Sequence, residues 1–286
     1  MKPFERAFRE RYHDGIELAA ANAKALREAA DLDHPSYVEL ELGEALMGEA
    51  AVLFLDIRGY TRIAMAFADR PAETAKIVDA VVGGAVQALP EYGAHINDYT
   101  GDGVMAIFGD GLGSLNAAHD AAVFAASDLM TDMSATLRAE LLGVEIEDPV
   151  QVAIGLVSGP VLWKRVGTPE NNRVMALGEV APLAAKYVSG NQTHAWETMI
   201  GGQVIDVVPA DLREKVDDYV HEYKGTTMKR ERWLLDTVTV SQRSESANDI
   251  TEMRLAATAA AVPPLPKPTP RPKQQGDGKK HVRTTG

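Results

Sequence analysis

The chain contains no cysteine, and this absence removes several classes of chemistry. Disulfide bonds, thiolate nucleophiles and cysteine-ligated zinc sites are all excluded. The sequence also has no apolar run of the roughly 18 residues that a membrane helix needs. Its first residues, MKPFERAFRERYHDG, carry too many charges for a secretory signal. We therefore expect a cytoplasmic protein that does not insert into a membrane.

Positive charge is also scarce, with 29 lysines and arginines against 41 acidic residues and a formal net charge of -12. This balance argues against nucleic acid or an anionic membrane as the main partner. A small polyanion remains compatible with the chain where local cations or metal ions neutralise it. With 286 residues, 45% of them hydrophobic, the chain has enough material for one domain of about 200 residues with flanking segments.

Composition divides the chain into three segments. In residues 1–45, apolar side chains recur three or four positions apart over 4–30 and predict an amphipathic helix that packs or dimerises. Residues 46–240 form the main domain. Residues 241–286 are rich in proline and lysine, which predicts a disordered tail. Its basic charge would suit an acidic partner, but a solubilising tail is the favoured interpretation.

Hydrophobic periodicity and turn residues predict the elements of the main domain. The predicted strands cover 50–56, 94–97, 104–108, 150–157, 160–166, 219–223 and 232–239. The predicted helices cover 71–88, 114–140 and 179–189. This order describes an α+β sandwich with helices on one face of a sheet.

A first candidate site lies in the motif LFLDIRGYT, residues 53–61. Asp56 ends a short apolar run that is typical of a buried strand. Gly59 permits a tight turn, after which the amides from Ile57 to Thr61 would face a concave site for phosphate oxygens. On its own, a strand that ends in Asp-x-x-Gly is more often a simple turn with a capping carboxylate.

A second candidate site lies in NDYTGDGVMAIFG, residues 97–109, where Asp102 stands in a hairpin between Gly101 and Gly103. Gly-Asp-Gly is common turn chemistry, so this motif is also weak alone. If the two strands are neighbours in one sheet, Asp56 and Asp102 converge at the same edge. Two carboxylates and a backbone carbonyl suit Mg²⁺ or Mn²⁺, which prefer oxygen ligands and bridge to the phosphates of a nucleoside triphosphate.

With these motifs in place, the chain resembles the class III nucleotidyl cyclases, the catalytic domain of adenylate and guanylate cyclases, from about Glu49 to Leu235. Five motifs occur in the family's order: FLDIRGYT, YTGDGVMAIFG, AIGLVSGPVLWKRVG, ALGEVAPLAAK and the pair Lys224-Gly225. The resemblance implies a ferredoxin-like α+β sandwich with an antiparallel-rich sheet. It also implies a homodimer whose active sites lie between the two subunits.

The resemblance further implies how the site would work. Asp56, the Ile57 carbonyl and Asp102 would bind two Mn²⁺ or Mg²⁺ ions per site, which activate the ribose 3′-hydroxyl and hold the triphosphate. Lys224 matches a family lysine on the terminal phosphates, where it would offset the charge of the leaving pyrophosphate. Substrate contacts are assigned to Ile57, Arg58, Gly59, Tyr60 and Thr61, the residues that follow the first aspartate.

The sequence departs from the family at the two positions that read a purine base, which are Asp98 and Met175. An ionised Asp98 accepts a hydrogen bond from an amine but cannot donate one, and the thioether of Met175 is only a weak acceptor. Neither purine code is present, and both residues are retained as substrate-binding candidates.

The family motif G-x-x-V-N-x-A-A-R reads here as the segment 178–186. Its asparagine is replaced by Pro182, which offers no donor. Its transition-state arginine is replaced by Lys186, which keeps the charge without the bidentate fork. We assign Lys186 as catalytic, with Arg173 as a candidate substitute cation that would equally fit a surface charge.

The chain also resembles the stand-alone bacterial pyrimidine cyclases of anti-phage defence, which lack the purine-reading pair. This predicts conversion of UTP, or CTP, to the 3′,5′-cyclic monophosphate and pyrophosphate, with a separately encoded effector that responds to the product. One alternative is an adenylate or guanylate cyclase with an atypical base pocket. Another is a degenerate cyclase-homology module that binds nucleotide or dimerises without turnover, although decay should not spare the metal ligands preferentially.

Overall fold

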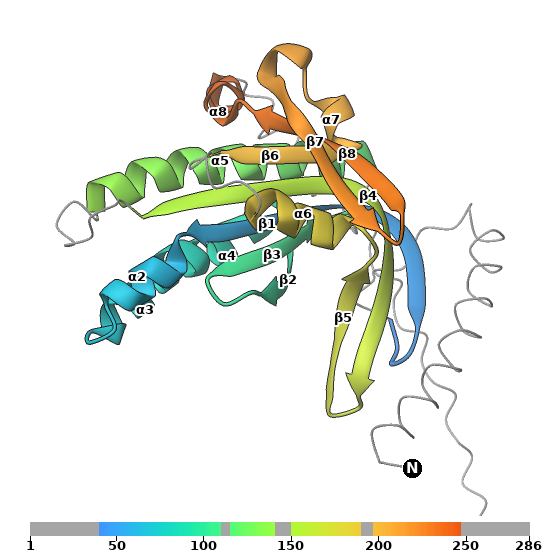
Figure 1. Ribbon diagram of the computed structural model, residues 1–286, viewed down its shortest axis with the longest axis horizontal. Coiled ribbons are helices and arrows are strands. Elements are labelled where there is room, and N and C mark those ends of the chain that lie inside the picture. Colours follow the sequence, from blue (N-terminus) through green and yellow to red (C-terminus); the bar gives the residue numbers. More distant parts are fainter. Residues whose placement is uncertain (1–39, 110–114, 141–149, 190–196, 247–286) are drawn as a thin grey trace, which may run out of the picture.

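The computed structural model of the chain describes residues 40–109, 115–140, 150–189 and 197–246 (Figure 1). The amphipathic helix predicted over 4–30 and nearly all of the predicted tail lie outside these residues. The predicted end of the main domain at residue 240 falls within the last described helix, which runs from Thr237 to Ser246.

One mixed sheet of eight strands organises the described residues. The strands are β1 (Ala45–Arg58), β2 (His95–Tyr99), β3 (Gly103–Phe108), β4 (Gln151–Thr168), β5 (Asn171–Leu177), β6 (Thr198–Gly202), β7 (Arg213–Tyr223) and β8 (Thr226–Leu235). Their order is β2-β3-β1-β4-β6-β8-β7, and β5 pairs with β4 outside this path. Every pairing is antiparallel except that of β4 with β6. The predicted α+β class with an antiparallel-rich sheet is confirmed.

Helices connect and cover these strands. They are α2 (Tyr60–Ala66), α3 (Pro71–Val78), α4 (Gly84–Ala88), α5 (Leu115–Glu140), α6 (Val180–Ser189), α7 (Val204–Val207) and α8 (Thr237–Ser246). A single π-helical turn, Asp79–Gly83, joins α3 to α4, so the helix predicted over 71–88 is continuous. Short 3₁₀ turns occupy Leu89–Tyr92 and Ala210–Leu212. No helix among the described residues is both long and apolar enough to cross a membrane.

The prediction of two strands over 150–157 and 160–166 was wrong, because β4 runs unbroken through both. Pro160 stands at the start of the second predicted strand. β4 last pairs with β6 at Ser158 and first pairs with β5 at Leu162. Among the described strands, one edge of β4 therefore has no partner at Pro160, and a missing N–H is tolerated there.

The strand predicted over 232–239 was also wrong in its second half. β8 ends at Leu235, and the backbone N–H of Thr239 donates to the carboxylate of Asp236 at 3.0 Å. This contact caps the first turn of α8. An aspartate before a threonine-rich segment was the signal that the strand interpretation missed.

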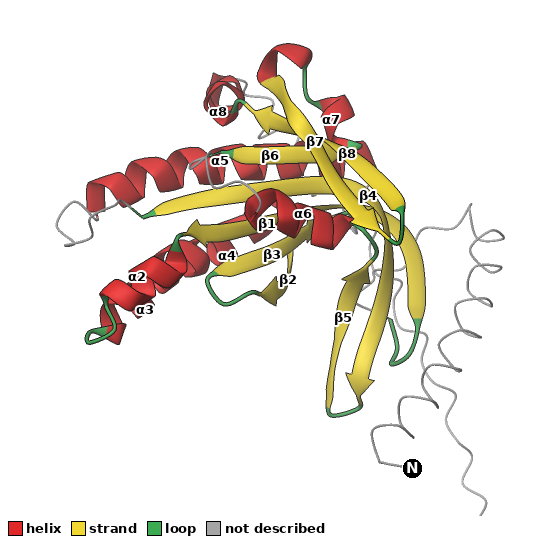
Figure 2. Ribbon diagram, viewed as in Figure 1, coloured by secondary structure: helices red, strands yellow, loops and turns green. Residues whose placement is uncertain are grey.

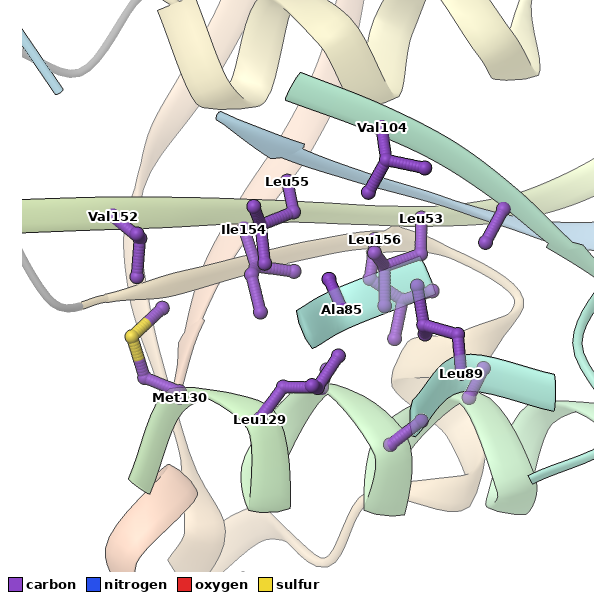
Figure 3. Packing of buried hydrophobic residues seen from close by; sticks show 14 of the residues in the cluster. Leu53, Leu55, Ala85, Leu89, Val104, Leu129, Met130, Val152, Ile154 and Leu156 are labelled. Carbon is purple, nitrogen blue, oxygen red and sulfur yellow. The ribbon is translucent and has the colours of Figure 1, made fainter. Parts of the chain in front are cut away.

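The two faces of the sheet carry two separate hydrophobic clusters. On one face, β1, β3 and β4 pack against α4 and α5, and Figure 3 shows Leu53, Leu55 and Ile154 facing Ala85 and Leu129. Alternation along β1 sends its even-numbered residues to the other face. That face is covered by α6, so helices lie on both sides of the sheet and not on one alone (Figure 2).

Candidate active site

Two carboxylates meet at one end of β1. β1 and β3 are antiparallel neighbours that place Asp56 opposite Gly103. The N–H of Ile57 donates to the carbonyl of Asp102 at 3.2 Å, which closes the β2–β3 turn against β1. A hydrogen bond also joins the carboxyl groups of Asp56 and Asp102. The two aspartates therefore form one group, although 46 positions separate them in the sequence.

Glycine is required at two positions around this pair. A Cβ on Gly103 would meet the Leu55 carbonyl, and would lie 2.8 Å from the Thr100 hydroxyl and 3.1 Å from Oδ1 of Asp56. Gly59 has a φ of 68° and a ψ of 24°, a left-handed conformation that turns the chain from β1 into α2. The close approach of the strands and the sharp exit from β1 both depend on the missing side chains.

The electrostatics of the pair favour a cation. Burial and, after it, the negative charge of Asp102 raise the pKa of Asp56 to about 7, against the opposing effect of Arg58. Burial also raises the pKa of Asp102. When Asp56 is protonated, its hydroxyl donates to the Asp102 carboxylate. Two ionised carboxylates within hydrogen-bonding reach of each other in a half-buried site are unfavourable unless a positive ion compensates for their charge.

The donor atoms at this edge suit a hard divalent cation. They are carboxylate oxygens and, next to them, the carbonyl of Ile57, which in an extended strand points to the same side as its own N–H. Within the described ranges, no cluster of three or more His, Asp or Glu side chains is placed to hold a metal ion. Two carboxylates and a carbonyl fit Mg²⁺ or Mn²⁺ only if substrate or water oxygens complete the coordination.

The residues that follow Asp56 differ in what they contact. Arg58 is half-buried, and its Nη1 donates to the carbonyl of Val188 at the end of α6, 2.7 Å away. Its guanidinium is thus engaged by a helix terminus. Tyr60 packs partly against the hydrophobic core, and Thr61 is exposed in the first turn of α2.

A second group of predicted residues assembles between β2 and β5. Nη1 of Arg173 and Oδ1 of Asp98 are 2.8 Å apart in an ion pair. Beside it, the amide of Asn97 donates to the carbonyl of Val174 at 3.1 Å. Met175 is half-buried and lies on the same face of β5 as Arg173, since residues two apart share a face. The two predicted base-reading residues, Asp98 and Met175, therefore lie in one region with Arg173, the candidate substitute cation.

The two remaining predicted cations lie on other elements. Lys186 is exposed on α6, four residues after the exposed Pro182, so both lie on the face of the helix that points away from the sheet. Lys224 stands in the β7–β8 turn with a φ of 48°, followed by Gly225 with a φ of 79°.

The residues that hold α6 on the sheet were not predicted from the sequence. Arg230 of β8 binds Glu179, and Tyr187 donates to the carbonyl of Glu231. These partners are 51 and 44 residues apart in the sequence. The pattern of residues within one segment does not predict contacts between segments that are this far apart in the sequence.

No protein-family model matches the chain. It is 24% identical over 220 residues to a cytidylate cyclase from Escherichia coli, covering 73% of this chain and 45% of that protein. It is 27% identical over 166 residues to an adenylate cyclase from Anabaena cylindrica, covering 58% of this chain and 32% of that protein. The chain thus spans less than half the length of these curated relatives.

Several solved structures that are named as adenylyl or guanylyl cyclases have a similar fold. The adenylyl cyclase CyaB from P. aeruginosa aligns with a TM-score of 0.58 and 21% identity, over 67% of this chain and 95% of that one. The guanylyl cyclase Cya2 aligns with a TM-score of 0.56 and 18% identity, over 68% and 94%. A class III adenylyl cyclase-like ATP-binding protein from Pseudomonas aeruginosa aligns with a TM-score of 0.51 and 18% identity, over 62% and 39%. The described domain has the class III nucleotidyl cyclase fold.

Proposed function

We propose that this chain is a nucleotidyl cyclase that converts a pyrimidine nucleoside triphosphate into its 3′,5′-cyclic monophosphate and pyrophosphate. The observation that carries this proposal is the contact between Asp56 and Asp102 at the end of β1, where burial and mutual repulsion raise the pKa of Asp56 to about 7. Repulsion between two such close carboxylates lowers the stability of the folded protein at neutral pH. Their presence is therefore best explained by a function, the binding of a cation.

In the reaction, the ribose 3′-oxygen forms a bond to the α-phosphorus while the bond from that phosphorus to the departing pyrophosphate breaks. Asp56, Asp102 and the Ile57 carbonyl would hold two Mg²⁺ or Mn²⁺ ions, which lower the pKa of the attacking hydroxyl and neutralise the triphosphate. Lys224, in the exposed β7–β8 turn, would place a point cation on the terminal phosphates.

The position of Lys186 supports an active site shared between two copies of the chain. Its side chain lies on the outward face of α6, whereas the carboxylate pair lies at the end of β1. In a homodimer, Lys186 of one subunit would stabilise the charge that develops on the phosphate held by Asp56 and Asp102 of the other. Lysine would do so as a point charge and not as a planar fork.

The ion pair between Asp98 and Arg173 supports pyrimidine selection. It presents a carboxylate acceptor beside guanidinium donors, with the apolar thioether of Met175 on the same face of β5. This arrangement matches the N3–H and O4 of uracil, or the N4 amine and N3 of cytosine. We take UTP as the first candidate substrate and CTP as the second.

We extend the proposal to the product, which would act as a second messenger in anti-phage defence through a separately encoded effector. The resemblance to the stand-alone pyrimidine cyclases supports this step. Neither nucleic acid nor membrane insertion has a part in it.

A nucleotide-binding module without turnover is the second candidate function. Pro182 favours it, because proline replaces the family's ribose-orienting asparagine and has no donor. The similarity in fold to an adenylyl cyclase-like ATP-binding protein is compatible with it.

Incubation of the purified full chain with ATP, GTP, CTP or UTP plus Mn²⁺, followed by mass spectrometry of the products, tests the proposal. We expect cyclic UMP or cyclic CMP from the wild type and no product from Asp102→Asn. Cyclisation of purine nucleotides alone would rule out the pyrimidine assignment. No product from any nucleotide, with binding retained, would favour the module without turnover.

A further inference from the structure

Helix α6 is held on the sheet by side-chain contacts near both of its ends. Before its first turn, the carboxylate of Glu179 receives a bidentate contact from Arg230 of β8, with 2.8 Å between Nη2 and Oε2. In its last turn, the buried Tyr187 donates its hydroxyl to the carbonyl of Glu231 at 2.8 Å. These two contacts connect α6 to β8. In the sheet, β4 and β6 lie between β8 and β1, the strand that carries Asp56.

The contact of Arg58 ties the same helix to β1. Arg58 is two residues beyond Asp56, so both side chains leave β1 on the face that α6 covers. Its Nη1 donates to the carbonyl of Val188, 2.7 Å away. That carbonyl belongs to the last turn of α6, where carbonyls have no partner within the helix and a cation complements the helix dipole. The strand that carries Asp56 therefore also holds the end of α6.

Close packing beneath α6 fixes its distance from the sheet. A Cβ on Gly155 of β4 would overlap the carbonyl oxygen of Ala184, so the helix lies directly on the strand. Leu183 and Tyr187 are also buried against this face of the sheet. The contact of Arg58 adds to this packing at the C-terminal end of the helix, which is the end that carries Lys186.

Resting on the proposed function, we infer that Arg58 is a positioning residue that sets Lys186 through α6. In the proposed homodimer, each Arg58 stands beside the carboxylate pair of one active site and holds the helix that serves the other. Arg58 thus joins the two active sites through protein and does not contact the substrate itself. This role differs from a direct contact of Arg58 with the substrate phosphates.

Steady-state kinetics separate the two roles. In Arg58→Met, a positioning role predicts that kcat falls about 10- to 100-fold, because small displacements of a reacting group are costly. KM, and the affinity for a non-hydrolysable UTP analogue, should stay within about threefold. Arg58→Lys should recover part of kcat, since its ammonium still reaches a carbonyl. Arg70→Met is the matched control, because Arg70 is an exposed arginine at the start of α3.

A double-mutant cycle with Lys186→Ala tests whether Arg58 acts through Lys186. The loss of kcat in Arg58→Met plus Lys186→Ala should be close to that of Lys186→Ala alone, because the displaced group is already missing. Multiplicative losses would overturn the inference, as would a rise in KM with an unchanged kcat.

Hydrogen exchange keeps this inference separate from the proposed function. In Arg58→Met, the amides of the last turn of α6 should exchange faster than in the wild type while those of α5 keep their rates. Unchanged exchange in α6 would refute the inference even if the wild type is active. A wild type that makes no product from any of the four nucleotides would refute the proposed function, and exchange would still decide whether Arg58 holds α6.

Discussion

Arg173 of β5 and Asp98 of β2 form an ion pair, with 2.8 Å between Nη1 and Oδ1, although 75 residues separate them in the sequence. The contact links two strands that are not neighbours in the sheet. Both side chains are partly exposed, so the pair contributes at most about 1 kcal/mol to stability. In the proposed function, the pair would present to the base an acceptor fixed beside a set of donors.

We therefore predict that Arg173→Ala lowers kcat/KM for UTP about 10- to 100-fold, through a rise in KM. The substitution removes a donor and leaves the Asp98 carboxylate without its cation next to a polar base. Steady-state kinetics with all four triphosphates measure the effect. Lys76→Ala removes an exposed ion pair of similar length on α3, 3.1 Å from Glu73, and should change neither constant. An equal kcat/KM in Arg173→Ala and wild type would exclude the pair from base recognition.

The raised pKa of Asp56 predicts a pH-dependent cost to the metal-free protein. Its pKa of about 7 in the folded protein exceeds the 3.8 of an unperturbed aspartate. The folded state therefore holds a proton that the unfolded chain has lost between these two values, and the stability linked to that proton disappears as pH rises through 7. We expect Asp56→Asn to be more stable than the metal-free wild type by about 2 kcal/mol near pH 8, roughly half of what the full shift would give in a dry site.

Urea unfolding in EDTA, at about pH 5 and about pH 8, measures this difference. The gain of the variant over the wild type should be larger at the higher pH. A gain that is equal at both values would mean that Asp56 ionises normally in the folded protein. Saturating Mn²⁺ should reverse the order at pH 8, because only the wild type keeps both carboxylates to bind it.

A third prediction concerns the space between β1 and the β2–β3 turn. Gly103→Ala would push a Cβ into the Leu55 carbonyl and against the Asp56 carboxylate. We expect a loss of about 1 to 3 kcal/mol in the free energy of unfolding, as for other overpacked sites, together with loss of activity. Gly84→Ala is the opposite control, because no atom from another described part of the chain lies within 4 Å of the added atom and Gly84 begins helix α4.

Gly84→Ala should stabilise the protein by about 0.5 to 1 kcal/mol through its helix propensity, with activity unchanged. Thermal unfolding of the two variants, measured side by side, gives the comparison. If Gly103→Ala were as stable and as active as the wild type, the carboxylate pair would not need the close approach of β3.

The sequence predicted the positions of Asp56 and Asp102 better than the contacts around them, because it carries signals of short range. Local patterns place Asp56 at the end of an apolar strand and Asp102 in a glycine-flanked hairpin, and the pairing of β1 with β3 brings the two together. The α+β class follows from the order of such patterns. By contrast, the bond from Arg58 to Val188 spans 130 residues, and nothing within either segment indicates it.

The errors in the fold have a similar origin. Pro160 is a local breaker, but the empty edge of β4 at that point is a property of the whole sheet. No strand was predicted over residues 171–177, where β5 pairs with β4 alone in the described sheet. Tertiary context decided both cases, and a single sequence does not contain that context in readable form.

The proposed sharing of each active site between two subunits leads to a mixing experiment. In the proposed site, Asp102→Asn would remove a metal ligand from one side and Lys186→Ala would remove the transition-state cation from the other side. Each homodimer then has two defective sites, and we expect its kcat to fall about 100-fold or more. In a mixed dimer, both lesions fall in the same site and the second site is intact.

Equal amounts of the two variants, unfolded and refolded together, should therefore recover about a quarter of the wild-type activity, since half of the dimers are mixed and each has one working site. Mixing Asp102→Asn with Asp56→Asn is the control, because both lesions lie on the same side and no pairing restores a site. Recovery only in the first mixture, measured by the rate of cyclic nucleotide formation, requires Lys186 and Asp102 of different chains to act together. If neither mixture recovers activity while both variants dimerise, Lys186 does not complete the partner's site.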